Sequence, residues 1–197
     1  MDSLRQLEEV FAHFPGIGPR QARRFVQYLL NKSPSFTKDF IRLVEDVKKA
    51  TSECEACHRM FYGSKSDICS ICFDSLRDQK ILMIVAHDSD MEAVERSASY
   101  RGLYFILGGT VSILNEKPED YIRLKQLLTR ISKLIDLKEI ILSLNATPEG
   151  ENTASIVRDT LNGKGFNITL LGRGLSTGSE LEYADSETIR SALNNRN

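Results

Sequence analysis

Several kinds of segment are missing from this sequence. No apolar run is long enough to cross a bilayer, and the N-terminus "MDSLRQLEEVF" has no basic stretch followed by an apolar one. A Gly-x4-Gly-Lys-Ser/Thr phosphate loop is absent, and no serine lies in a nucleophile elbow. These absences predict a cytoplasmic chain and argue against a P-loop nucleotide hydrolase or an α/β-hydrolase.

Carboxylates are also missing from one stretch. The formal net charge is only -1, yet no acidic residue lies between Glu9 and Asp39, and residues 81–197 are net acidic. The acid-free stretch holds five cations, Arg20, Arg23, Arg24, Lys32 and Lys38. A local basic segment on a nearly neutral chain predicts a defined anion-binding patch. A solvated helix face is the plainer alternative.

A glycine turn opens this basic segment. Apolar residues at helical spacing predict helices over 3–13 and 19–31, and "PGIG" (15–18) breaks the pattern between them. Glycine permits a tight turn whose N–H groups can face an anion. Arg20 and Arg24 are four residues apart and share a helix face, with Arg23 beside them.

This pattern is typical of a helix-hairpin-helix that contacts the DNA phosphate backbone without reading base sequence. The residues predicted to contact DNA are Gly16, Gly18, Arg20, Arg23 and Arg24. The alternative is a hairpin that only packs or oligomerises.

The four cysteines of the chain all lie in one short window. Cys54 and Cys57 form one Cys-x2-Cys knuckle, and Cys69 and Cys72 form a second, with eleven residues between the two knuckles. Four thiolates can close the tetrahedral shell of one Zn2+ and leave no position for water, so we expect a structural site. His58 could serve as a substitute ligand, but four cysteines suffice. A redox dithiol pair, or unrelated buried cysteines, remain alternatives.

The rest of the chain alternates strands with helices. Strands are predicted at 80–86, 103–107, 138–144 and 166–172, with helices at 88–99, 118–135 and 148–162. This order predicts an α/β fold with a mainly parallel sheet. A third helix of the opening region is expected at about 36–50, and a short one near Asp185 in the tail.

Acidic residues near the strand ends raise the possibility of a Mg2+ site. Each acid has a structural explanation. We expect Asp88 to cap the helix that follows it, and Glu149 and Glu151 to occupy a first helical turn, where carboxylates favour the helix dipole.

Taken together, these motifs resemble one family. The stretches that carry the resemblance are "FPGIGPRQARR" (14–24), the two knuckles, "AVERSASYRGLYFILGG" (93–109), "LSLNATPEGENTA" (142–154) and "RGLSTGSELEYADSETI" (173–189). They are similar to those of the RecR family of bacterial recombination mediators. The resemblance implies an α/β chain with a helix-hairpin-helix (1–52), a four-cysteine zinc finger (53–75), a Toprim domain (76–172) and a C-terminal tail (173–197).

The resemblance also implies a function. Such a protein is a non-enzymatic DNA-binding mediator of recombinational repair, associated with the nucleoid. It forms a ring-shaped clamp, as a tetramer or dimer, and acts with RecO, and in some settings RecF, to help load RecA onto single-stranded DNA. The matching positions imply DNA contact through Arg20 and Arg24 and RecO contact through Glu149 and Glu151.

One departure bears on an alternative function. Ala86 stands where catalytic Toprim domains need a glutamate, and "LSLNATPEGE" replaces their Asp-x-Asp pair. A Toprim-type nucleic-acid enzyme with a degenerate Mg2+ site is therefore the second hypothesis. A zinc-stabilised scaffold that binds only proteins is a weaker third.

Overall fold

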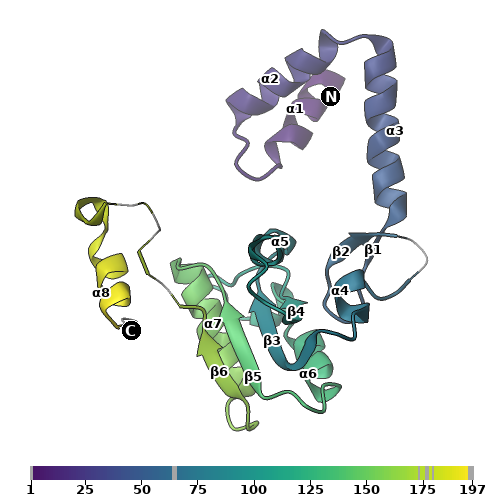
Figure 1. Cartoon of the computed structure of the whole chain (residues 1–197). Coiled ribbons are helices and arrows are strands. Elements are labelled where there is room, and N and C mark those ends of the chain that lie inside the picture. The colour runs from purple at the N-terminus through teal and green to yellow at the C-terminus, as the bar shows by residue number, and fades with distance from the viewer. Residues whose placement is uncertain (1, 64–65, 173, 176–177, 179, 195–197) are drawn as a thin grey trace. The chain divides into compact units, whose positions relative to one another are not determined.

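The computed structural model describes residues 2–63, 66–172, 174–175, 178 and 180–194. It is an α/β structure that divides into two compact units (Figure 1). Unit 1 comprises residues 1–51 and 62–64, and unit 2 comprises residues 52–61 and 65–197. The predicted α/β class is confirmed.

Unit 1 consists of three helices, α1 (Ser3–Ala12), α2 (Pro19–Leu30) and α3 (Pro34–Ala50). Each begins at a recognisable signal. The Asp2 carboxylate accepts a hydrogen bond from Leu4 N at 3.1 Å, and the Ser33 hydroxyl accepts one from Phe36 N at 3.3 Å. Pro19 and Pro34 occupy the first turns of α2 and α3, where proline's missing N–H costs nothing.

The interior of unit 1 is small. Its buried side chains, among the described residues, are Ala22 and Val26 on α2. Phe11 and Phe25 join α1 to α2, with ring centroids 5.7 Å apart. Helix α3, which is described over its whole length, has no buried residue and leaves a row of large apolar side chains exposed, namely Phe40, Leu43, Val44 and Val47.

Unit 2 is built on a four-stranded sheet, which can be followed in Figure 1. Its strands are β3 (Asp78–Val85), β4 (Gly102–Ile106), β5 (Glu139–Ser143) and β6 (Asn167–Leu170). Their order is β4-β3-β5-β6, and every neighbouring pair is parallel. The connecting helices are α5 (Asp88–Ser97), α6 (Leu124–Ser132) and α7 (Pro148–Leu161). The predicted parallel βαβ arrangement is therefore confirmed.

The sheet has a separate apolar core on each face, because successive side chains of a strand point to opposite faces. Leu82 and Ile84 of β3 belong to one cluster, together with residues of α6 and α7. Met83 and Val85 belong to the other, together with Met91 of α5 and the cysteine segment. The cysteine segment thus takes the place that a further helix would occupy on the second face.

The cysteine segment has secondary structure that the sequence did not reveal. Strands β1 (Thr51–Glu53) and β2 (Met60–Tyr62) pair as a two-stranded sheet, and α4 (Ser70–Phe73) carries part of the second knuckle. Three residues per strand are too few for an alternating pattern to be recognised.

Two sequence-based expectations are wrong. The single helix predicted over 118–135 is a 3-10 turn, η1 (Pro118–Asp120), followed by α6 from Leu124. Arg123 leaves the helical path because its N–H donates to Leu107 O at 2.9 Å, beyond the end of β4. Asp88 is not a cap either, because His87 caps α5 and the Asp90 carboxylate accepts from His87 N at 2.9 Å.

The tail carries η2 (Leu181–Tyr183) and α8 (Ser186–Asn194). Asp185 precedes α8 and its carboxylate accepts from Thr188 N at 2.9 Å, as expected for the predicted helix start. Residues 173, 176–177 and 179 of the quoted tail motif lie outside the described residues. None of the helices in the described part of the chain has the length and apolar character that crossing a membrane requires.

Candidate functional site

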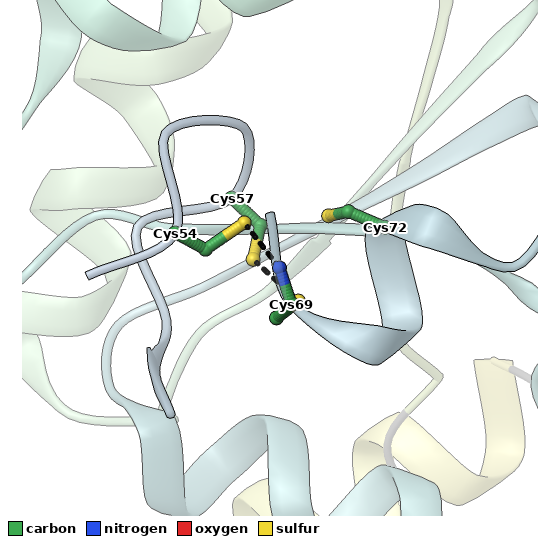
Figure 2. A group of neighbouring side chains, drawn as sticks. All are labelled: Cys54, Cys57, Cys69 and Cys72. Carbon is green, nitrogen blue, oxygen red and sulfur yellow. Dashed lines mark hydrogen bonds between the residues drawn. The ribbon is translucent and has the colours of Figure 1, made fainter. Parts of the chain in front are cut away.

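The four cysteine side chains converge on one point in unit 2, as Figure 2 shows. Their sulfur atoms all lie within 4.8 Å of one another. The first knuckle closes through a hydrogen bond from His58 N to Cys54 O at 2.8 Å. The second knuckle meets it where Cys69 N donates to the Cys54 sulfur at 3.3 Å. The backbone therefore brings four ligand atoms together from two loops.

The donor set fits a metal cation. All four cysteines are free thiols, and Cys54, Cys57 and Cys69 are fully buried while Cys72 is half-buried. Hydrogen bonds from the Cys57, Cys69 and Cys72 thiols and from Cys69 N hold the pKa of Cys54 well below its usual value, despite burial. Hydrogen bonds with the other thiols, together with burial, raise the pKa of Cys57 and of Cys72, so the negative charge is concentrated on Cys54 rather than on these two thiols. A buried cluster that holds thiolate among further thiols is suited to a bound cation.

His58 has a different role from that of a ligand. Its Nδ1 lies 2.5 Å from the Glu53 carboxylate, and its ring packs edge-on against Phe105 with centroids 5.2 Å apart. It does not belong to the group of converging ligand atoms. A metal held here would have the four cysteines as its ligands.

The cysteine loops are fastened to the edge of the large sheet. Ile106 N, on edge strand β4, donates to Cys57 O at 2.9 Å. Met60 N donates to the Asp88 carboxylate at 2.9 Å, which explains why Asp88 does not cap its own helix. The loops thus cover an edge that would otherwise expose unpaired backbone groups. The four-cysteine cluster and the packing of the sheet are therefore parts of the same construction.

The hairpin of unit 1 presents unbonded N–H groups. Gly16 adopts φ +74°, a left-handed conformation that glycine takes without strain. The turn is closed by Ile17 N, which donates to Phe14 O at 3.0 Å. Within the described part of the chain, the N–H groups of Gly16, Gly18 and Arg20 have no acceptor.

The three arginines of α2 lie around one shallow cavity of about 370 Å3, as the helical spacing predicted. Arg23 Nε lies 3.8 Å from the Glu8 carboxylate, and Arg24 Nη1 donates to the Gln21 side chain at 3.4 Å. No carboxylate of the described residues pairs with Arg20. The sequence alone does not reveal the Glu8 contact, because no local pattern shows which turn of α1 will face α2.

The acids near the strand ends do not come together. Ala86 is fully buried directly after β3, and Asp88 and Asp90 are bonded to backbone N–H groups. Glu149 and Glu151 are exposed in the first turn of α7, as predicted. Among the described residues, the cysteines are the group of three or more potential metal ligands that lie close together.

Comparison with known proteins first gives the class. Residues 80–172, which contain the parallel sheet, match the family model described as the Toprim domain, so this is a Toprim-domain protein with an added four-cysteine module. Residues 174–197 match the model described as the C-terminal region of RecR.

The comparison then gives the family. A curated relative from Lactobacillus acidophilus is 34% identical over 193 residues, covering 98% of this chain and 96% of its own. Relatives from Lactococcus lactis subsp. lactis and Streptococcus mutans are 35% and 36% identical, covering 99% and 98% of this chain and 96% of their own. All three are named recombination protein RecR. This chain belongs to the RecR family.

Proposed function

We propose that this chain acts in DNA recombination and repair as a non-enzymatic mediator that holds DNA by its phosphate backbone. The observation that carries the proposal is the combination, in one helical hairpin, of free N–H groups at a glycine turn and an arginine-lined cavity. The recombination role rests on membership of the RecR family.

Phosphate is the anion that suits this hairpin. Peptide N–H groups and guanidinium groups bind phosphate oxygens and carry no information about base sequence. Arg20 has no carboxylate partner among the described residues, so binding a phosphate does not require it to break an existing ion pair. The contacts proposed are those of Gly16, Gly18, Arg20, Arg23 and Arg24.

One hairpin supplies few charge contacts, so a single chain would bind DNA weakly at physiological salt. A ring of two or four chains would gain affinity by multivalency. The exposed apolar row of α3, which includes Phe40, Leu43 and Val47 at 41%, 54% and 55% exposure, supports such an assembly. A monomer seldom leaves a contiguous apolar surface of this kind uncovered.

Partners and metal complete the proposal. The exposed acids Glu149 and Glu151 of α7 are the proposed contact for RecO, with RecF as a further partner, and the assembly would help load RecA at the nucleoid. The metal proposed for the four cysteines is Zn2+, because four thiolates in a closed shell suit its tetrahedral preference. Its role would be structural.

The test is DNA binding across a salt series by the wild type and by the double variant Arg20→Ala, Arg24→Ala. The slope of log K against log salt should fall by about 1.8 for each hairpin engaged on duplex DNA, since each lost phosphate contact removes about 0.9. The size of the fall therefore also reports how many chains contact one duplex.

The matched control removes two other exposed cations of unit 1, Arg5→Ala and Lys48→Ala, which do not line the cavity. This control should keep most of the slope. Equal binding by the wild type and the Arg20, Arg24 variant would refute the hairpin clamp. Strong preference for one base sequence would also contradict it.

A further inference from the structure

A second basic cleft lies in unit 2, at residues for which the sequence patterns predict no role. Its volume is about 390 Å3, and it separates the first cysteine knuckle from α6. One wall carries Glu55 and Ala56 of the knuckle, and the other carries Lys125, Arg130 and Lys133. Three cations thus face one carboxylate.

The cations share a wall because of their spacing. Lys125, Thr129 and Lys133 follow one another at intervals of four residues, which places them on one face of α6 and its cap. Helix electrostatics favours the cations at the C-terminal end of α6, but it disfavours Lys125 in the first turn, where the dipole is positive. An anion bound in the cleft would offset this unfavourable interaction of Lys125.

Within the described part of the chain, the cations also have no carboxylate partner. Glu55 makes no ion pair with them, and no other carboxylate of the described residues does so. The Nε–H of Arg130 is shielded from solvent and has no acceptor among the described residues. Native structures rarely leave a buried donor unsatisfied, and an anion bound at this wall would supply an acceptor for it.

We propose that this cleft binds a phosphate group, with Arg130, Lys125 and Lys133 as its cationic contacts. We assign the phosphate to a nucleic-acid backbone, and only that assignment rests on the proposed function. The cleft would then be a second DNA contact in a different unit from the hairpin. A free phosphate compound shares the same chemistry and is distinguished by the test below.

The experiment uses the full-length, metal-loaded protein and two probes, inorganic pyrophosphate and a single-stranded oligonucleotide over a salt series. The test variant is Lys125→Gln, Lys133→Gln. The matched control is Lys117→Gln, Lys164→Gln, which removes two exposed lysines of unit 2 that do not line the cleft.

We expect the test variant to lose about tenfold or more in pyrophosphate affinity, the scale of one charged hydrogen bond. Its salt slope on the oligonucleotide should fall by about 1.4 for each chain engaged, because each contact on a single strand contributes about 0.7. The control should retain both properties. A fall in oligonucleotide binding supports a nucleic-acid ligand, whether or not pyrophosphate binding also falls.

The remaining outcomes distinguish a nucleic-acid phosphate from a free phosphate compound. Loss of pyrophosphate binding with an unchanged oligonucleotide slope means that the cleft takes a free phosphate compound instead. No effect on either probe overturns the proposal. The Arg20, Arg24 variant should bind pyrophosphate at this cleft as the wild type does, so a failure of the hairpin clamp is recognised independently.

Arg130→Met adds a readout that a merely structural role would not produce. Methionine replaces the packing of the side-chain stem and removes a donor that has no acceptor among the described residues of the free protein. We therefore expect an unchanged or raised melting temperature together with weaker pyrophosphate or oligonucleotide binding. A lowered melting temperature with unchanged binding of both probes would show that Arg130 serves only the fold.

Discussion

Removal of the proposed Zn2+ should unfold the cysteine segment and expose part of one face of the large sheet. The segment contributes Cys54, Cys57 and Cys69 to the second core, and among its described residues the other buried apolar side chains are only Ala56 and Ile71. So little apolar burial cannot order loops of this length without the cross-link that a metal provides. We therefore expect a chelator to act on this segment first.

The free-energy cost of losing the metal can be estimated in two ways. A structural zinc site contributes about 10–16 kcal/mol of apparent binding free energy at neutral pH. Independently, the segment shares one core cluster with Met83, Val85, Met91, Tyr104 and Ile106, a face that α5 also helps to cover. Exposing five such side chains at about 1.5–3 kcal/mol each costs at most roughly 8–15 kcal/mol. Both figures rival the whole stability of a typical domain, about 5–15 kcal/mol.

Hydrogen exchange with and without chelator is the suitable assay, because the chain has no tryptophan to report the change by fluorescence. Protection should be lost in residues 54–72 and reduced in β4 (Gly102–Ile106). Helix α7, which packs on the opposite face of the sheet, is the internal control and should lose much less. Native mass spectrometry should find one Zn2+ per chain. A metal-free protein that keeps full protection in residues 54–72 would refute this reasoning.

Two further predictions concern the stability of unit 2. Glu95→Leu should lower the free energy of unfolding in urea by about 1–3 kcal/mol, because the Arg77 guanidinium keeps only the Gly102 carbonyl as an acceptor and the Tyr104 hydroxyl loses its acceptor. Burial opposes the charge of Glu95, but hydrogen bonds from Arg77 and Tyr104 outweigh it and hold its pKa below the usual value. The difference in unfolding free energy between the wild type and the variant should thus be complete above about pH 4.3 and should shrink as the pH falls through the lowered pKa of Glu95. A difference that grew on acidification would contradict this. Gly150→Ala should cost about 1–3 kcal/mol or more, measured as a lower melting temperature, because its Cβ would collide with the backbone carbonyl of Asn145. An unchanged melting temperature would show that the Asn145 turn yields freely.

Much of the architecture followed from short-range patterns. Short apolar runs that alternate with segments of helical periodicity predicted the four parallel strands. The two Cys-x2-Cys knuckles predicted that the four sulfur atoms converge. These features depend on residues close in sequence, where spacing alone determines which side chains share a face. The glycine turn and the arginine face of α2 are likewise features that depend on residues close in sequence.

The misses depended on contacts between distant residues. The helix predicted over 118–135 is interrupted because Arg123 N bonds to Leu107 O, and Asp88 gives up its capping role to accept from Met60 N. The pairing of Arg23 with Glu8, and the basic wall that faces the first knuckle, likewise arise only when separate elements pack. No local pattern contains this information.

The end of β3 also bears on the enzymatic alternative. A Toprim-type metal site would need several carboxylates free to converge where this strand ends. Here Ala86 is an apolar, fully buried residue at that point, and Asp90 closes the first turn of α5. Asp88 holds Met60 N of the cysteine segment. Asp88 therefore fastens the cysteine segment to the sheet and Asp90 closes its own helix, so neither carboxylate is held free for a metal at the end of β3.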